Sequence, residues 1–586
     1  MNKKVILVLL LLVLALAFTA GCRGDGGGAA GAGGIVGAPD YVREHVVFNW
    51  HANYTWFSWP GAGWNGDMVS RHWSDMFDIY AVLTTPDGIA DEILNLMIIA
   101  NELPDAIWMD RGSQMQEMAR LGLLYSIDEL NQMVYRNYLY DLNVPLSTQL
   151  LYAELTDGVN YVIPNWVRMG TIGELGGATG GNVGWLYVSN VWEAVGSPTI
   201  RTFEDLYAYA VAVRDANLVN HQGLPIIPVL IHAATDQGQS FVNGIFGAFG
   251  GWWAGWGGWE SIRPDGTFGS SWENPIWRDA VMEANRWFRE GLFPATVFTN
   301  TDPMRNELLS NGRAGLMWID HSLDDNVNFR TLLSEQDPGN SIELFISEVG
   351  GRYYTRFPSA TRGITQQQVT HETHATLGWN GSVIVRGASN PGRIFELFTH
   401  MLSLPGSIEM TLGPPGVLWE NLDADGFPIM TRSPALLTSD ERLEIGLWNW
   451  DLKGHANNVD DAKFAANRGL PPEERNWVES MQENVFTPNL RLTDEFVNMT
   501  PTIPFGTPLA IRRTQITDFW EEMLPQIIMA ATAEEANRLF DTVLQFNIDN
   551  GREEIDRIHH ARWLYNLDLQ GGTIFPVTPN RNFLPQ

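Results

Sequence analysis

The sequence predicts a large α/β protein, and three observations support this fold class. The chain has 586 residues, 45% hydrophobic and only 18% charged, which supports a sizeable buried core and excludes general disorder. Short apolar runs alternate with segments that carry helix-start and helix-stop signals, a pattern typical of parallel βα units. No repeat of fixed period is present, which disfavours solenoids and propellers.

The first elements follow one another closely in the chain. Residues 45–50 are predicted to form a strand and residues 91–101 a helix that ends before Pro104. Residues 106–109 form a short apolar run, which predicts a buried strand. Residues 113–121 are predicted to be helical, with Gly122 as the stop signal.

Later helices are predicted from their N-terminal residues. Thr202 with Asp205, and Thr532 with Glu535, have the spacing of a capping box. At Asn274-Pro275 and at Asn390-Pro391, a capping residue precedes a proline at the first helical position.

The N-terminus has the pattern of a targeting segment. Lys3 and Lys4 precede an apolar run over residues 5–18, which is too short to span a bilayer comfortably. The run ends in a TAGC sequence at residues 19–22, which resembles a bacterial lipobox and predicts that Cys22 is lipidated. Residues 23–38 form a glycine-rich linker. The alternative is an ordinary secretory signal, residues 1–22, that happens to contain a cysteine.

Charge and composition narrow the possible functions. There are 37 Lys and Arg against 68 Asp and Glu, so the formal net charge of −31 argues against a nucleic-acid partner. The single cysteine excludes an intrachain disulfide. The 24 tryptophans are far more than an average chain of this length contains, so aromatic side chains are candidates for a functional role.

A series of short motifs resembles one bacterial family. Residues 99–113 (IANELPDAIWMDRGS) and 121–130 (LGLLYSIDEL) match the family's strand, helix and "GxLxxLD" segment. Further matches follow in the family's order, at residues 158–165, 186–206, 287–317, 388–407 and 413–420. Together they resemble the extracellular solute-binding proteins of ABC importers, and in particular a large lipoprotein subgroup associated with oligosaccharide uptake.

The resemblance implies a two-lobed fold with a hinge and a ligand cleft between the lobes. Lobe 1 would comprise residues 39–165 and 319–412, and lobe 2 residues 166–318 and 413–586. It further implies a binding protein rather than an enzyme, without a cofactor or metal. The expected partners are an oligosaccharide, the permease subunits of the transporter and, through the lipid anchor, the outer face of the bacterial cell membrane.

Sugars present hydroxyl groups and flat C–H faces, so a sugar site needs aromatic platforms beside polar side chains. One cluster of candidates follows the first predicted strand, where carboxyl ends of strands in an open α/β sheet face the ligand. It contains Trp56, Trp59 and Trp64, next to Trp50 and Tyr54. A second cluster, in a glycine-rich stretch, contains Trp252 and Trp256. For each tryptophan taken alone, packing in the core is the competing interpretation.

Other candidates stand at the ends of predicted strands or near the chain crossings between lobes. Asp110 and Arg111 follow the strand at 106–109, where similar family members hold polar ligand contacts; an N-capping Asp beside a surface Arg is the alternative. The remaining candidates are Trp185, Asp320, Trp379 with the adjacent Asn380, and Trp419.

Several motifs were rejected, and two other functions stay open. His371 and His374 lack the HExxH spacing, and the DADG sequence at 423–426 is better explained as a hairpin turn than as a calcium loop. The alternatives within and beyond the binding class are a receptor for peptides or another polar solute, and a secreted carbohydrate-active enzyme. Such an enzyme would need two opposed carboxylates, which the many acidic residues do not exclude.

Overall fold

The computed structural model divides the chain into two units, Met1–Glu44 and His45–Gln586, and the second is described below. The residues described are 45–134, 144, 146–167, 184–231, 236–253, 259–319, 323–369, 373–374, 377–378, 380–450, 456–489, 491–499, 502–504 and 506–569. Cys22 and the predicted linker at 23–38 lie outside them.

The described elements alternate between strands and helices. The principal α-helices are α2 (Met68–Phe77), α3 (Ala90–Ala100), α4 (Ser113–Arg120), α5 (Ile127–Val134), α7 (Leu146–Glu154), α8 (Ser189–Ala194), α9 (Phe203–Ala216), α10 (Gln239–Ala248), α11 (Pro275–Arg289), α12 (Asp302–Ser310), α13 (Leu323–Gln336), α14 (Pro391–Leu402), α15 (Leu404–Leu412), α16 (Ser439–Ile445), α17 (Ala456–Gly469), α18 (Trp477–Met481), α19 (Pro508–Ile528), α20 (Ala533–Asp549) and α21 (Arg552–Leu569).

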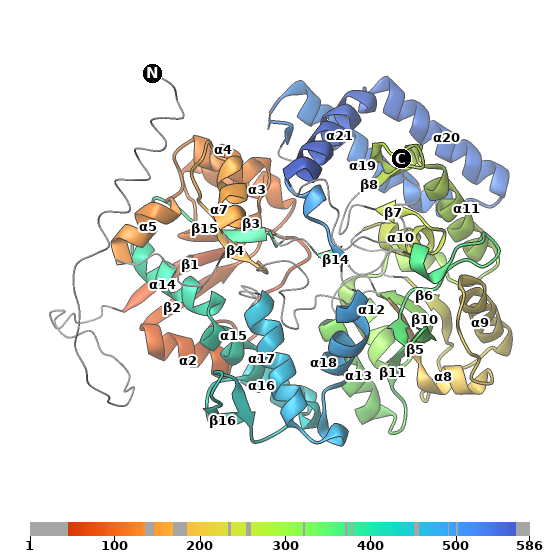
Figure 1. Ribbon diagram of the computed structural model, residues 1–586, viewed down its shortest axis with the longest axis horizontal. Coiled ribbons are helices and arrows are strands. Elements are labelled where there is room, and N and C mark those ends of the chain that lie inside the picture. The colour runs from red at the N-terminus through yellow and green to blue at the C-terminus, as the bar shows by residue number, and fades with distance from the viewer. Residues whose placement is uncertain are drawn as a thin grey trace. The chain divides into compact units, whose positions relative to one another are not determined.

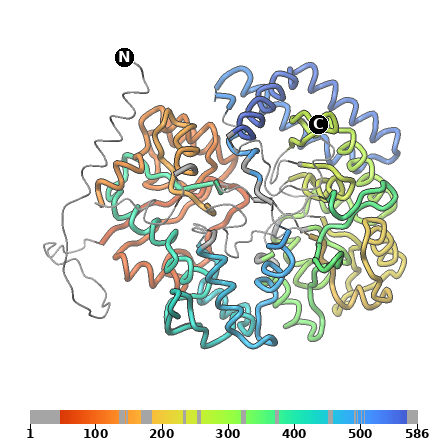
Figure 2. Tube along the Cα trace, viewed as in Figure 1, coloured from red at the N-terminus to blue at the C-terminus, as the bar shows by residue number. Residues whose placement is uncertain are grey.

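The first sheet has five strands in the order β2-β1-β3-β15-β4. They are β1 (Val46–Ala52), β2 (Ile79–Thr84), β3 (Ala106–Asp110), β4 (Ile163–Asn165) and β15 (Asn380–Ile384). β1 runs parallel to β2 and β3, as predicted, but β15 is antiparallel to both β3 and β4. In Figures 1 and 2 the teal β15 therefore lies among red and orange strands from a much earlier part of the chain.

Helices cover both faces of this sheet. In β3, Ala106 and Trp108 belong to one hydrophobic core with residues of α2, α5 and α14, whereas Ile107 and Met109 belong to another with α3 and α4. Alternate side chains of a strand point to opposite faces, so a strand covered on both faces is apolar throughout. The buried strand predicted at 106–109 is confirmed.

The second sheet has four strands in the order β11-β5-β10-β6. They are β5 (Gly184–Val188), β6 (Ile227–Leu230), β10 (Ala314–Ile319) and β11 (Ile342–Leu344). β10 is parallel to β6 but antiparallel to β5, so this sheet is also mixed. α9, α10 and α11 contribute apolar side chains to the hydrophobic core that contains its strands.

Strand pairing and core packing bear on two of the predicted lobe boundaries. β11 was assigned to the first lobe, yet it pairs with β5 in the second sheet. Residues beyond 413 were assigned to the second lobe, yet Trp450 and Val459 lie in the core of the first sheet, and Trp450 donates to the Asp67 carboxylate at the start of α2 (3.1 Å). β11 is thus part of the second sheet, and the chain still contributes to the core of the first sheet at Trp450 and Val459.

The predicted helix starts are largely confirmed. Thr202 and Asp205 form the reciprocal capping box of α9, and Thr532 accepts a hydrogen bond from the Glu535 amide at the start of α20. Asn274 caps α11 ahead of Pro275. Asn390 precedes α14 as predicted, but its side chain makes no capping bond within the described structure.

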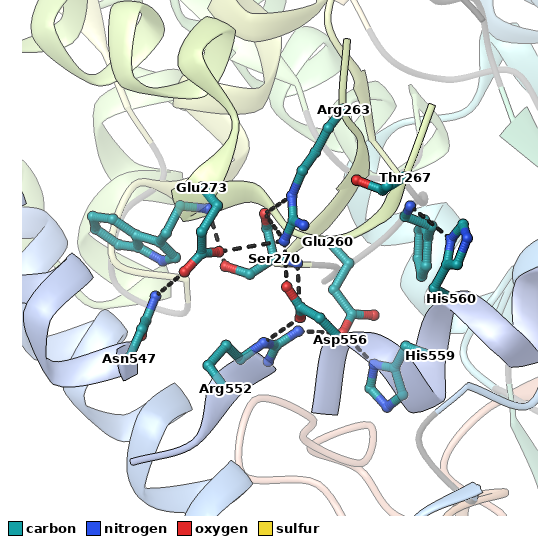
Figure 3. A network of polar contacts seen from close by, with 12 residues as sticks. Glu260, Arg263, Thr267, Ser270, Glu273, Asn547, Arg552, Asp556, His559 and His560 are labelled. Atoms are coloured by element: carbon teal, nitrogen blue, oxygen red, sulfur yellow. Dashed lines mark hydrogen bonds and ion pairs between the residues drawn. The ribbon is translucent and has the colours of Figure 1, made fainter. Parts of the chain in front are cut away.

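A buried ionic network holds the C-terminal helices against a small three-stranded sheet (Figure 3). This sheet contains β7 (Trp252–Trp253), β8 (Glu260–Ile262) and β9 (Phe268–Ser270). Arg552 of α21 bonds both to Glu260 (2.6 Å) and to Asp556 (2.6 Å), and Asp556 also pairs with Arg263. A Cβ atom at Gly269 would come within 2.6 Å of the Asp556 side chain, so this close approach requires glycine.

Two distant segments pair as a short parallel ribbon. β14 (Thr373–His374) precedes the return of the chain to the first sheet, and β18 (Arg491–Leu492) precedes α19; the two strands run side by side. The 423–426 turn joins β16 (Trp419–Leu422) to β17 (Pro428–Met430), so the predicted hairpin is confirmed. Among the described helices, none is long and apolar enough to cross a membrane.

Candidate functional site

Polar side chains gather at one edge of the first sheet. β1, β3 and β4 end at this edge and β15 begins there, because β15 runs antiparallel to its neighbours. Asn380 of β15 is in register with Asp110 on one side and with Asn165 on the other. Three polar residues from three strands are thus brought next to each other, as expected at the carboxyl edge of an open sheet.

Four side chains at this edge form a continuous chain of hydrogen bonds. The Asn165 amide donates to the Asn380 side-chain oxygen (2.8 Å), and the Asn380 amide donates to the Tyr54 hydroxyl (3.0 Å). The Tyr54 hydroxyl donates to the Asp110 carboxylate (2.8 Å). Asn165 and Asn380 are fully buried, whereas Asp110 is exposed, so the chain of bonds leads from the core to the surface.

Asp110 combines exposure with a perturbed ionisation. Desolvation by the surrounding protein raises the pKa of its carboxyl, and the negative charge of Asp91 adds to this. The hydrogen bond from Tyr54 and the positive charge of Arg111 lower the pKa and offset part of the rise. The carboxyl is thus partly desolvated, although the residue as a whole is exposed to solvent.

Arg111 is held by the segment that leads into β15. Its guanidinium donates to the Gly378 carbonyl oxygen (2.6 Å) and lies 5.1 Å from the centre of the Tyr152 ring. Tyr152 donates to the neighbouring Leu377 carbonyl oxygen (2.5 Å), and burial raises the pKa of this phenol, which therefore stays protonated at neutral pH. Gly378 has φ of +71°, and a Cβ atom there would lie 2.2 Å from the backbone carbonyl oxygen of Asn165.

A second polar group lies where α3 and α4 begin. Asn53 donates to the Asp91 carboxylate (3.3 Å), and Gln114 donates to the Asp91 carbonyl oxygen (3.1 Å). The side-chain oxygen of Gln114 is buried and has no hydrogen-bond partner among the described residues. Buried amide oxygens are rarely left unpaired, so a ligand or water is a natural partner for this atom.

Aromatic rings flank the polar edge. Trp56 is 46% exposed, and its ring centre lies 5.0 Å from that of Tyr54 and 6.1 Å from that of Trp108. Trp59 is partly buried, donates its indole N–H to the Thr84 carbonyl oxygen (2.9 Å) and packs on Trp50. An exposed indole supported by other rings is a suitable platform for the apolar face of a sugar.

The other predicted ligand contacts are in different places. Trp64, Trp185 and Trp419 are buried in three separate hydrophobic cores, and Trp252 is buried on β7. We therefore leave these four out of the candidate site. Trp256, Asp320 and Trp379 lie outside the described residues.

Some site residues were missed from the sequence. Asn165 ends a short strand, as Asp110 does, so the strand-end rule could have found it. Tyr152 and Gln114 carry no comparable signal, because they reach the site from helices through contacts distant in sequence. No group of three or more His, Cys, Asp or Glu side chains in the described structure is placed to hold a metal ion.

Comparisons with known proteins identify the fold. No family model matches the chain, and no curated protein matches it. One similar solved structure is the ABC-transporter substrate-binding protein FusA of Streptococcus pneumoniae in complex with kestose, with 14% identity, a TM-score of 0.59, and coverage of 90% of this chain and 100% of that one.

Two further solved structures support the same assignment. The N-glycan transport solute-binding protein NgtS of Streptococcus pneumoniae, in complex with Man1GlcNAc, has 12% identity and a TM-score of 0.54, over 89% of this chain and 100% of that chain. An HMO-binding solute-binding protein of Bifidobacterium longum infantis has 13% identity and a TM-score of 0.55, over 88% and 98%. The chain therefore has the α/β fold of ABC-transporter solute-binding proteins, which confirms the predicted fold class.

Proposed function

We propose that the protein is the substrate-binding component of an ABC importer and that it captures an oligosaccharide. The observation that carries this proposal is the exposed Trp56 ring packed against Tyr54, whose hydroxyl donates to the Asp110 carboxylate, at the sheet edge where ligands bind in α/β folds. An indole face and a carboxylate acceptor together match the C–H face and the hydroxyl groups of a sugar. The neighbours solved with kestose and Man1GlcNAc support the same ligand class.

The proposed binding mode is capture between two lobes, one around each main sheet. A ligand that contacts both lobes favours the closed arrangement by its differential affinity, and a permease can then recognise that arrangement. We propose lobe boundaries that follow strand pairing and core packing. β11 then belongs to the lobe of the second sheet, and the region around Trp450 belongs to the lobe of the first sheet.

We also propose that Cys22 is lipidated and tethers the protein to the outside of the cell membrane through the glycine-rich linker at 23–38. The charged n-region, the short apolar run and the small residues before the cysteine support this assignment.

Isothermal titration calorimetry against fructans, mannose-containing glycans, milk oligosaccharides and short peptides tests the function. A fragment comprising residues 39–586 retains the whole compact unit and is suitable for the titrations. Saturable binding of a sugar that is recovered unchanged supports the proposal. Binding of peptides alone would replace it with a peptide receptor, and consumption of the sugar would replace it with an enzyme.

A further inference from the structure

The hydrogen-bonded chain at the sheet edge has a fixed direction. The Asp110 carboxylate can only accept, so the single proton of the Tyr54 hydroxyl must point to it. The Tyr54 oxygen is then an acceptor, which requires Asn380 to turn its amide N–H toward it and its oxygen toward Asn165. The amide orientation of two buried asparagines is therefore set by the ionised group at the exposed end.

This direction leaves an acceptor at the surface. Among the described residues, the Tyr54 hydroxyl is the only group that donates to the Asp110 carboxylate, so its other oxygen keeps free lone pairs. A ligand that meets this atom must supply a donor, because two acceptors facing each other without a proton repel.

The charges around this atom favour the same kind of ligand. Asp91 is a second exposed carboxylate near Asp110, and it raises the pKa of Asp110. Among the described residues, the nearby cation is Arg111, whose guanidinium donates to the Gly378 carbonyl oxygen and lies over the Tyr152 ring. Within the described part of the site, two carboxylates thus stand against one cation.

We propose that Asp110 determines specificity by binding hydroxyl donors, so that the site takes neutral sugar residues and rejects uronates. This inference rests on the proposed function and narrows its substrate class. A sugar hydroxyl donating to a carboxylate makes a charge-assisted hydrogen bond, stronger than one between neutral groups. A uronate would instead place a carboxylate beside Asp110 and Asp91 in a partly desolvated site, where like charges repel strongly.

The test compares two forms of one probe on the full chain, purified in detergent. The probe is a glycan array of neutral oligosaccharides, printed next to the same oligosaccharides after oxidation of their primary hydroxyls to carboxylates. We expect the wild-type protein to bind a neutral form at least 10-fold more tightly than its oxidised counterpart. Asp110→Asn should weaken neutral binding roughly 10- to 100-fold and reduce the preference over the oxidised form. Asp128→Asn, a surface carboxylate in the first turn of α5, serves as the control and should change neither value.

A second variant covers the possibility that Asp110→Asn does not fold. Tyr54→Phe keeps the ring but removes the proton donated to Asp110, and with it one of the two influences that lower the pKa of this carboxyl. Binding of the neutral sugar should then be lost at a higher pH on acidification than in the wild type. A purely structural role for Tyr54 would change affinity without moving this pH.

The possible results are distinct. Equal or tighter binding of the oxidised form by the wild type overturns the inference and leaves the oligosaccharide function intact. The inference is also overturned if Asp110→Asn keeps the wild-type preference for the neutral form and Tyr54→Phe loses binding at the same pH as the wild type. Absence of binding to both forms overturns the proposed function and this inference with it.

Discussion

Replacing Trp56 with alanine tests the proposed sugar platform directly. The Trp56 ring is supported by Tyr54 and Trp108, and 46% of the residue is exposed. A tryptophan side chain offers up to about 250 Å², so roughly 110 Å² of Trp56 is open to a ligand. A sugar ring on one face would cover about half of that, or ~60 Å². At about 25 cal/mol per Å² this is ~1.5 kcal/mol, roughly a tenfold change in Kd.

The assay is calorimetric titration of the 39–586 fragment with the sugar found in the binding panel. Trp56→Ala should raise the Kd about tenfold and leave the melting temperature nearly unchanged, because the ring is half exposed. Trp192→Ala is the matched control: this tryptophan lies on α8, beside the second sheet, and should not affect binding. An unchanged Kd in Trp56→Ala, with the fold intact, would refute the platform.

Three other predictions concern the segment that leads into β15, a buried carboxylate and the predicted lipid anchor. In urea titrations, Gly378→Ala should lower the free energy of unfolding by more than about 1 kcal/mol, because φ is +71° and the new Cβ would meet the backbone carbonyl oxygen of Asn165. The control Gly61→Ala should be nearly neutral, because its new Cβ would meet nothing within 4 Å. Glu409→Gln should lower the free energy of unfolding by about 3 kcal/mol at pH 7. Burial raises the pKa of Glu409, but hydrogen bonds from His400, His72 and Trp73 outweigh it and lower the pKa from 4.5 to about 2. A depressed carboxyl pKa stabilises the fold above pH 4.5 and loses that effect as the pH falls toward 2, so the variant and the wild type should converge in urea titrations at low pH, and parallel curves would contradict this. Cys22→Ser should move the protein from the membrane fraction to the supernatant when cells are fractionated, and equal retention in membranes would exclude lipidation.

The fold was largely predictable where local signals determine it. The cap at Thr202 and the buried strand at 106–109 depend on residues close in sequence, and both were found. The sheet to which each strand belongs was harder to predict. β11 is a three-residue strand, too short to show a period, and only its pairing with β5 assigns it to the second sheet.

Part of the candidate site could also be located from the sequence, and its role in binding stays a prediction. The rule that ligands meet strand ends led to Asp110 and to the Trp56 loop, and the structure brings them together through Tyr54. Residue type alone could not separate an exposed indole such as Trp56 from a core indole such as Trp185, because tryptophan suits both environments. Tyr152 joins the site through Arg111, a contact that no sequence pattern encodes.

The burial of the tryptophans determines which optical signal can report binding. The chain has 24 tryptophans, and well over half of them are buried. Their emission would form a large constant background, so a ligand on Trp56 would change the total intensity only slightly. Acrylamide, a quencher that reaches exposed indoles first, would instead act on Trp56, the exposed tryptophan of the described structure, before it reaches the partly and fully buried ones. The fraction of emission protected from acrylamide by a sugar is therefore a more sensitive measure of occupancy than the shift of the whole spectrum.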